Sequence, residues 1–453
     1  MSAARFDPGG PLVGALRPPP DKSISHRAAL LAAMADGESQ LTGFLDAADT
    51  RSTLDAVRAL GADVAVDDGQ APGAQAVRVR GIGLSGPGQR AGGGPTAIDV
   101  GNAGTLLRLL PGWLAGQGAG EWTLDGDDSI RRRPVDRIAA PLRLMGARVE
   151  CRDGRLPPLE VRGAALSGIT YRLPVASAQV KSCVLLAGLL AEGETEVVEP
   201  APSRDHTERM LLAAGVDLRS ETPGPGLAVR GRLPGRTITL RPPAGLAAAG
   251  FEIPGDFSSA AFFIVAALLV PRSRVRIEGV GLNPTRVGLL GILNRMGAAI
   301  EVEEGLPVGG EPRGTVDVRS SPLRGTRVAV GETPLAIDEL PLVALAGCFA
   351  EGETVVTGAM ELRLKESDRI ATVVEAVRAL GGEAEALNDG FTVRGIGGLR
   401  GGRVLSHGDH RLAMLGAVAG LASPEGVEVE GMEAAAVSYP AFERDLRGLL
   451  GSG

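Results

Sequence analysis

The chain has 453 residues, of which 44% are hydrophobic and 22% are charged, an ordinary globular composition. This length exceeds that of one ordinary domain, so two or more domains are expected. The formal net charge of −7 argues against a nucleic-acid-binding protein, because such proteins are usually basic, although clustered arginines can still form a local pocket for small anions.

Neither the N-terminus nor the apolar runs of the chain indicate a targeting or membrane segment. The first ten residues contain no apolar signal core, and the longest apolar run, 260–270, is far shorter than a membrane span. The cysteines have no metal-like spacing, and Cys183 and Cys348 fall in apolar helical stretches where inert buried thiols are expected. These features favour a soluble protein of the reducing cytoplasm.

Strongly apolar helices are predicted at regular intervals along the chain. Their bodies, such as 28–34 and 261–269, are apolar on every side, which is typical of helices buried in a core. The spacing between their starts is about 70 to 80 residues, which indicates an internal repeat. The six starts lie near Asp21, Asn102, Ser177, Asp256, Asp338 and Asp409.

A second, less apolar helix is predicted after each buried one. Each ends at a glycine, and five of the six begin near an arginine. A glycine just past a helix and before a strand is typical of a left-handed C-terminal cap. Six units of two helices and several strands therefore suggest two domains of three units each. The glycines are Gly61, Gly146, Gly215, Gly297, Gly381 and Gly451, and the arginines are Arg51, Arg137, Arg204, Arg286 and Arg369.

The polar first turns of the buried helices are the candidate binding site. Helix N-termini carry unpaired N–H groups and the positive end of the helix dipole, so several such ends facing one space would hold anions. Capping alone would explain the Ser, Asn and Asp residues in these turns. It does not explain why Lys, Arg, His and Gln accompany them, so the set as a whole favours an anion site.

Several phrases in these turns carry a family resemblance. Residues 20–27 read Pro-Asp-Lys-Ser-Ile-Ser-His-Arg, and residues 363–369 read Arg-Leu-Lys-Glu-Ser-Asp-Arg. Supporting phrases occur in the matching order at 101–105, 133–134, 177–182, 204–207, 337–339 and 409–411. Through these phrases the chain resembles the 5-enolpyruvylshikimate-3-phosphate synthase family from about residue 20 to residue 440.

The resemblance implies an α/β fold of two similar domains, each built from three β-α-β-α-β-β repeats. This is the enolpyruvyl transferase fold, which is similar to an inverse α/β barrel. We expect an N-terminal domain at 21–247 and a C-terminal domain made of 248–453 together with 1–20. We also expect a monomer whose two domains close on substrate, because the site residues come from both.

The resemblance also implies substrate contacts, and arginine suits them because guanidinium groups pair with carboxylate and phosphate through two hydrogen bonds. For shikimate 3-phosphate the implied contacts are Lys22, Ser23, Arg27, Ser177, Ala178, Gln179, Arg204, Asp338 and Lys365. For phosphoenolpyruvate they are Lys22, Gly104, Arg133, Gln179, Arg369 and Arg411.

The implied reaction moves the enolpyruvyl (1-carboxyvinyl) group of phosphoenolpyruvate to the 5-hydroxyl of shikimate 3-phosphate by addition and elimination, in chorismate and aromatic amino acid biosynthesis. Asp338 is the implied base for the hydroxyl, Glu366 the acid at C3, and Lys22 an aid to proton transfer. A bland alternative for Glu366 is an ion pair with a neighbouring base such as Lys365. The reaction needs no metal or organic cofactor, and neither nucleic acid nor membrane is an expected partner.

Two other functions stay open at this point. UDP-N-acetylglucosamine enolpyruvyl transferase shares the fold but usually carries a cysteine, sometimes an aspartate, on a basic loop, and residues 126–134 contain no cysteine. A non-catalytic anion-binding protein on the same fold would be expected to lose Lys22, Asp338 or Glu366, and all three are present.

Two positions bear on how the chain fits the family pattern. Some branches carry a lysine before a Ser/Thr-aromatic-Pro phrase, where this chain has Val437, so one phosphate contact is expected to be missing or supplied elsewhere. Glyphosate-tolerant members often have alanine at the last glycine of Gly-Asn-Ala-Gly. This chain keeps Gly104, so sensitivity to glyphosate is expected.

Overall fold

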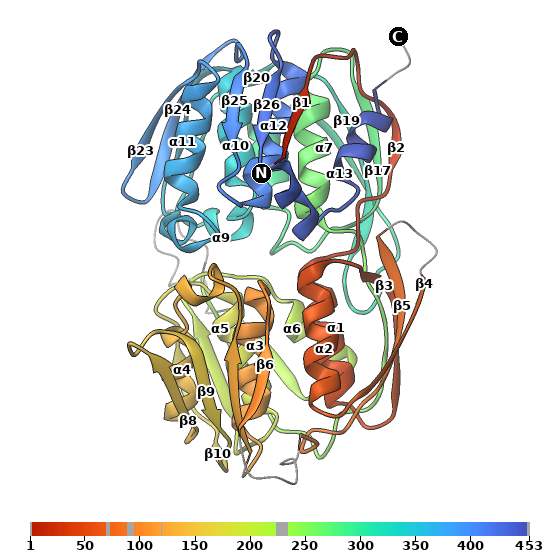
Figure 1. Cartoon of the computed structure of the whole chain (residues 1–453), viewed down its shortest axis with the longest axis vertical. Helices are drawn as coiled ribbons and strands as arrows, with labels where there is room; N and C mark the ends of the chain where they lie inside the picture. The colour runs from red at the N-terminus through yellow and green to blue at the C-terminus, as the bar shows by residue number, and fades with distance from the viewer. Residues whose placement is uncertain (1, 69–72, 88–94, 119, 223–233, 451–453) are drawn as a thin grey trace.

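The computed structural model describes residues 2–68, 73–87, 95–118, 120–222 and 234–450. The chain forms two lobes of mixed helix and strand, one above the other in Figure 1. Each lobe has its own core of buried apolar side chains. One core is drawn from residues 24–253, and the other from residues 257–449 together with Phe6 and Leu12. We call them the N-terminal and the C-terminal lobe.

The second unit of the N-terminal lobe has the predicted β-α-β-α-β-β order in its plainest form. Its sheet runs β6-β7-β9-β8, with β6 parallel to β7 and the other pairs antiparallel. A parallel pair needs a crossover connection, which α3 supplies. The elements are β6 (Thr96–Asp99), α3 (Gly104–Ala115), β7 (Glu121–Asp125), η1 (Ile130–Arg132), α4 (Asp136–Leu144), β8 (Arg148–Arg152) and β9 (Leu156–Arg162).

The other two units of this lobe follow the same plan. The first contains α1 (Lys22–Met34), β3 (Glu38–Leu45), α2 (Ala48–Ala59), β4 (Asp63–Asp68) and β5 (Ala74–Arg80). The third contains β10 (Leu166–Ser167), β11 (Thr170–Arg172), α5 (Ala178–Gly188), β12 (Ala191–Glu192), β13 (Thr195–Glu199), α6 (His206–Ala213), β14 (Leu218–Glu221) and β15 (Arg236–Leu240).

The fourth and fifth units of the chain lie in the C-terminal lobe and follow the same plan. The fourth contains α7 (Phe257–Leu269), β17 (Arg274–Gly281), α8 (Gly288–Arg295), β18 (Ala299–Glu304) and β19 (Arg313–Arg319). The fifth contains β20 (Leu323–Arg324), β21 (Arg327–Val328), α9 (Thr333–Ala336), α10 (Leu340–Phe349), β22 (Ala350–Val356), η3 (Met360–Leu364), α11 (Arg369–Ala379), β23 (Glu383–Leu387) and β24 (Gly390–Ile396).

The sixth unit is completed by the N-terminus of the chain. Its sheet runs β1-β26-β25, in which β1 lies antiparallel to β26 and takes the place of a C-terminal hairpin strand. The N-terminus accordingly lies in the upper lobe of Figure 1. The elements are β25 (Gly402–Leu405), α12 (His410–Ala422), β26 (Val427–Glu430), η4 (Met432–Val437), α13 (Phe442–Gly448) and β1 (Ala3–Phe6).

The chain crosses between the lobes twice, and a strand next to each crossing pairs with a strand far away in the sequence. β2 (Val13–Leu16) pairs in parallel with β17, and β16 (Gly250–Glu252) pairs in parallel with β3. Each lobe thus receives the first strand of its first unit from across the junction. The expected limit between 247 and 248 assigns β16 to the C-terminal domain, whereas Phe251 and Ile253 pack in the N-terminal core. A limit after Ile253 describes the two cores better, and the domain limits stay a prediction.

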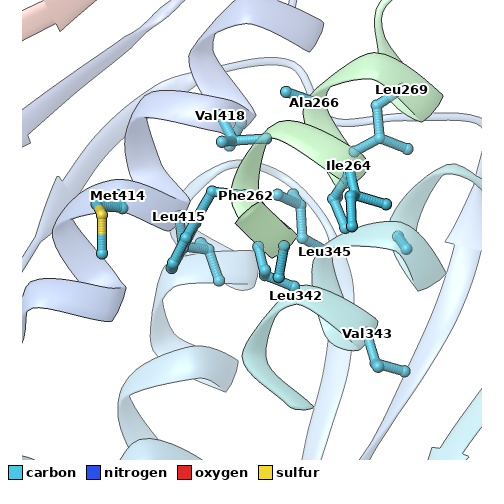
Figure 2. Packing of buried hydrophobic residues seen from close by; sticks show 14 of the residues in the cluster. Phe262, Ile264, Ala266, Leu269, Leu342, Val343, Leu345, Met414, Leu415 and Val418 are labelled. Carbon is cyan, nitrogen blue, oxygen red and sulfur yellow. The ribbon is translucent and has the colours of Figure 1, made fainter. Parts of the chain in front are cut away.

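The six predicted buried helices are α1, α3, α5, α7, α10 and α12. Figure 2 shows α7, α10 and α12 packed together through side chains such as Phe262, Leu342 and Leu415. Fully burying one such side chain contributes about 1.5–3 kcal/mol. The thiols of Cys183 and Cys348, which were predicted to be buried, are buried in α5 and α10. Burial raises the pKa of both, to about 12 for Cys348.

The structure can be compared with the predicted starts and ends of these helices. Five of the six predicted capping glycines have positive φ, from 82° at Gly215 to 112° at Gly146, and Gly451 lies outside the described residues. The starts predicted near Asn102 and Asp338 lie two residues before the observed ones, since α3 begins at Gly104 and α10 at Leu340. The side chains of Asn102 and Asp338 do not cap these helices, since they pair with basic groups instead. No helix in the described ranges is long and apolar enough to cross a membrane.

Candidate active site

A cavity of about 350 Å³ lies between the lobes, at the N-terminal ends of the buried helices. Its N-terminal wall includes the first turns of α1, α3 and α5, and its C-terminal wall includes the segments before α10 and α11 and the first residues of α11 and α12. All the site residues expected from the sequence line it: Lys22, Ser23, Arg27, Gly104, Arg133, Ser177, Ala178, Gln179, Arg204, Asp338, Lys365, Glu366, Arg369 and Arg411.

The cavity wall carries an excess of positive charge. Among its lining residues, ten are Lys or Arg and five are Asp or Glu. Moreover, the buried Nε atoms of Arg133 and Arg411 have no hydrogen-bond partner among the described residues. A buried donor left without an acceptor costs about 1–3 kcal/mol, so these two guanidinium groups are not fully paired within the described residues. The wall is therefore suited to an anionic ligand with several oxygen atoms.

Asp338 lies at the centre of the basic groups. Lys365 Nζ is 3.3 Å and Arg369 Nη1 is 3.1 Å from its Oδ1, and Arg204 pairs with its Oδ2 from the opposite lobe. Burial alone would raise the pKa of Asp338, but Lys365, Arg204 and their neighbours outweigh it and hold that pKa well below its usual range. Asp338 is therefore a carboxylate at neutral pH.

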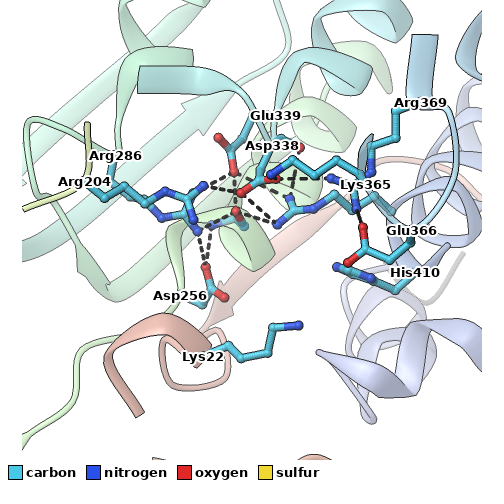
Figure 3. Close-up of polar contacts among 12 residues, drawn as sticks. Lys22, Arg204, Asp256, Arg286, Asp338, Glu339, Lys365, Glu366, Arg369 and His410 are labelled. Carbon is cyan, nitrogen blue, oxygen red and sulfur yellow. Dashed lines mark hydrogen bonds and ion pairs between the residues drawn. The ribbon is translucent and has the colours of Figure 1, made fainter. Parts of the chain in front are cut away.

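Glu366 is held by two arginines, one from each lobe. Its Oε2 accepts a hydrogen bond from Arg369 Nη2 at 2.6 Å, and its Oε1 is 3.8 Å from Arg133 Nη1 (Figure 3 shows the pair with Arg369). Burial opposes ionisation, yet Arg369 and Arg133 hold the pKa of Glu366 well below its usual range. The ion pair considered with Lys365 is thus made with Arg369 instead, and the ligand-free carboxyl is ionised.

Lys22 approaches the cavity from the other lobe. It is the first residue of α1, whose N-cap Asp21 accepts a hydrogen bond from Ile24 N at 2.9 Å. Its ammonium pairs with Asp49 Oδ2 at 3.0 Å, so a first-turn residue of α2 fixes its direction. Figure 3 shows Lys22 apart from the cluster around Asp338, across the cavity from it.

Arg27 faces the cavity one turn along α1, and its hydrogen-bond partners among the described residues are all neutral. Its guanidinium donates to Thr207 Oγ1 at 2.8 Å, to Ser182 Oγ at 3.0 Å and to the Ser23 carbonyl at 2.9 Å. Burial is the main cause that lowers the pKa of Arg27 to about 10, so the side chain stays charged at neutral pH. A guanidinium without a carboxylate partner adds to the attraction for an anion.

The first turn of α5 contributes neutral donors to the same wall. Ser177 is the N-cap of α5, and Ala178 and Gln179 are its first two residues. Gln179 Nε2 donates to Thr105 Oγ1 at 3.3 Å, which joins α5 to the first turn of α3. The N–H groups of such a turn, with the helix dipole behind them, favour a bound anion.

Several lining residues were not singled out as site residues from the sequence. Arg108 lies one turn after Gly104 on α3, so helical spacing could have indicated it. Arg137 and Glu361 form an ion pair of 2.7 Å across the junction, and no local pattern predicts such a partner. His410 also lines the cavity, and burial together with Lys22 and Arg411 lowers its pKa to about 3, so it is neutral at pH 7.

Arg286 is a third arginine that lines the cavity and was not among the expected site residues. Arg286 pairs with Asp256 at 3.2 Å and with Glu339 at 3.0 Å, and Ser258 donates to Glu339. The 256–259 segment, expected only to cap α7, is therefore part of a buried network that reaches Arg411 through Ser258 Oγ at 3.1 Å. Val437, where a family lysine is missing, is not among the residues that line the cavity.

A sequence model of the family described as EPSP synthase (3-phosphoshikimate 1-carboxyvinyltransferase) matches residues 6–446. The chain belongs to the EPSP synthase family. It is 50% identical to a 3-phosphoshikimate 1-carboxyvinyltransferase of Thermus thermophilus over 98% of both proteins. It is 47% identical to an enzyme of the same name from Desulfitobacterium hafniense, over 97% of this chain and 95% of that one.

Solved structures give the same family and fold. The EPSP synthase of Acinetobacter baumannii matches with a TM-score of 0.82 and 40% identity, over 99% of this chain and 98% of that one. The enolpyruvyl transferase NikO of Streptomyces tendae has a TM-score of 0.71 at 19% identity, over 98% and 96%, and supports the fold alone. The expected enolpyruvyl transferase fold is thereby confirmed.

Proposed function

We propose that this member of the EPSP synthase family transfers the carboxyvinyl group of phosphoenolpyruvate to the 5-hydroxyl of shikimate 3-phosphate, releasing phosphate and 5-enolpyruvylshikimate 3-phosphate. The observation that carries the proposal is one cavity in which Lys22, Asp338 and Glu366 stand among cations from both lobes. The named relatives, which match over nearly the whole chain, support the same substrates.

The acceptor's phosphate would bind at the first turn of α5. Ser177 and the Ala178 N–H would donate to it from the helix end, and Arg204 and Lys365 would approach from the two lobes. The ring hydroxyls would then face Ser23, Arg27 and Gln179, with the 5-hydroxyl toward Asp338. In this arrangement the phosphate replaces Asp338 as the partner of Arg204 and Lys365.

Phosphoenolpyruvate would bind between Lys22, Arg133, Arg369 and Arg411, with Gly104 and Gln179 close by. Arg133 and Arg411 both line the cavity and can present their guanidinium groups to it. Lys22 and Arg411 stand on opposite lobes, so the bound anion would bridge the cavity. Three arginines and a lysine can thus hold a carboxylate and a phosphate at once.

Bound anions would also prepare the two carboxyls for catalysis. Lys365 and Arg204 lower the pKa of Asp338, and Arg369 and Arg133 lower that of Glu366. When substrate oxygens take over these cations, both pKa values rise toward the range in which a carboxyl accepts and donates protons. Asp338 becomes a better base, and Glu366 can carry the proton that it must deliver.

The chemical steps then balance within the cavity. The acceptor oxygen bonds to C2 of phosphoenolpyruvate as its proton passes to Asp338, and C3 takes a proton from Glu366. The surrounding cations stabilise the tetrahedral intermediate. C3 next returns a proton to Glu366 and the double bond re-forms. The C2–O bond to phosphate breaks at the same time, and phosphate leaves with the electron pair and takes up the proton that Asp338 had accepted.

Product analysis tests the proposal. The purified chain is incubated with phosphoenolpyruvate and either shikimate 3-phosphate or UDP-N-acetylglucosamine, and the products are identified by mass spectrometry. We expect the carboxyvinyl adduct of shikimate 3-phosphate only. An adduct of the nucleotide sugar alone would contradict the proposal, and so would the absence of both.

A further inference from the structure

The loop that carries Arg204 is held from the C-terminal lobe by a buried polar cluster outside the cavity. Asn283 Nδ2 donates to Asp205 Oδ1 at 2.7 Å and to Glu311 Oε2 at 2.9 Å. Thr285 Oγ1 donates to Asp205 Oδ1 at 3.2 Å, and His206 Nδ1 lies 2.7 Å from Glu311 Oε1. All five residues are buried. We call them the junction cluster.

The same loop is held from the N-terminal lobe by a second buried cluster. Lys181 Nζ lies 2.9 Å from Glu199 Oε2 and 2.6 Å from Glu208 Oε1. Glu199 in turn accepts hydrogen bonds from Ser203 Oγ at 2.8 Å and from Ser203 N at 3.3 Å. Lys181 is fully buried and Glu199 nearly so, so neither has water as an alternative partner.

Arg204 therefore lies between two anchored neighbours. Ser203 is fixed by Glu199, Asp205 is fixed by Asn283 and Thr285, and the Arg204 side chain itself is 18% exposed and turns to Asp338 in the cavity. None of the junction cluster residues lines the cavity. They cannot touch a bound substrate there, so any effect they have on it must pass through the loop.

We propose that Asn283 and Thr285 are positioning residues that hold Arg204 at the acceptor's phosphate. This inference rests on the proposed function, which gives Arg204 that contact. A guanidinium fork binds phosphate well only in the right orientation, so tilting the loop weakens the contact without removing the charge. Because the cluster joins α6 of one lobe to the β17 end of the other, it also keeps Arg204 in register with Asp338 across the junction.

Two variants of different severity test the inference. Asn283→Leu keeps the approximate volume but removes the amide that links Asp205 to Glu311, whereas Thr285→Val only removes a hydroxyl. We expect KM for shikimate 3-phosphate to rise about tenfold or more in Asn283→Leu and several-fold in Thr285→Val, with KM for phosphoenolpyruvate and kcat nearly unchanged. Thr354→Val, an equally buried threonine of the C-terminal lobe away from the loop, is the matched control.

An Arg204→Ala background separates positioning from general damage. If Thr285 acts through Arg204, Thr285→Val has no further effect on KM for shikimate 3-phosphate once Arg204 is gone. A persisting effect, an equal rise in both KM values, or unchanged KM in Thr285→Val would overturn the inference, and Thr285→Val decides it if Asn283→Leu fails to fold. If the wild-type chain makes no product with shikimate 3-phosphate, the proposed function has failed instead.

Discussion

At the residue scale, the two carboxyls of the cavity are paired with the cations that the substrates need. Asp338 is held by Lys365 and Arg204, and Glu366 by Arg369 and Arg133. Such pairs stabilise the ligand-free fold, because an excess of buried cations without counterions would be unfavourable. The same pairs keep both carboxyls ionised until substrates compete for the cations.

Replacing Asp338 by asparagine tests this pairing through the pH dependence of stability. The folded-state pKa of Asp338 lies below its unfolded value of about 3.9, so its contribution is fully present above about pH 4 and is lost as the pH falls through the folded pKa. We expect Asp338→Asn to lower the free energy of unfolding by about 1–3 kcal/mol at pH 7. Urea unfolding between pH 3 and pH 8 should show the gap to wild type narrowing below pH 4, and a gap that widens there would contradict the pairing.

Gly104 provides a second residue-scale test. A Cβ at this position would lie 2.9 Å from Arg133 Nη1 and 3.0 Å from Arg108 Nη1, so both guanidiniums must move. In Gly104→Ala we expect KM for phosphoenolpyruvate to rise about tenfold while KM for shikimate 3-phosphate stays within about twofold. Steady-state kinetics with each substrate varied in turn checks this, and a rise confined to shikimate 3-phosphate would be evidence against the assigned contact.

At the element scale, arginines at or just before the starts of α8 and α11 link the buried helices of the C-terminal lobe through ion pairs. Arg286 joins Asp256 at the start of α7 to Glu339 at the start of α10. Arg369 joins Asp338, just before α10, to Asp409 at the start of α12 at 2.8 Å. The helix starts that line the cavity are thus held in register by two buried cations.

Arg286→Met should therefore destabilise the fold strongly. Its removal takes the paired cation from buried Asp256 and leaves Glu339 with Arg411 at 3.6 Å, and breaking such a buried pair typically costs about 3–5 kcal/mol. Arg324→Met, the same change at an exposed position, should cost less than about 0.5 kcal/mol. Urea unfolding of both variants checks the contrast. Similar losses in the two variants would show that the ion pairs of Arg286 contribute little to the free energy of unfolding.

The sequence predicted most helix ends but missed some polar roles at this scale. Glycine caps and apolar helix bodies are local signals, which is why Gly61 or the body 261–269 could be recognised. Asn102 and Asp338 lie just before their helices but do not cap them, because their side chains bind Arg133 and Lys365 from distant segments. The role of Ser258 was missed for the same reason, since its partner Glu339 lies in another unit.

At the scale of the whole molecule, the cavity exists because two lobes present their helix starts to one space. Family phrases spread along the chain indicated which residues belong there, and all of them line one cavity. Contacts across the junction were not predictable, because pairs such as Arg137 with Glu361 depend on how the lobes meet. The pairing of β16 with β3 was equally hidden, since β16 is short and pairs with a distant segment.

The most direct measurement is phosphate release from phosphoenolpyruvate in the presence of shikimate 3-phosphate, comparing wild type with Glu366→Gln. Glutamine keeps the shape of Glu366 but cannot supply a proton to C3, so we expect a loss of about 10²–10⁴-fold in kcat with the fold intact. Release by the wild type and its near-absence in the variant would support carboxyvinyl transfer in this cavity. A variant with wild-type kcat, or a wild type that releases no phosphate, would contradict it.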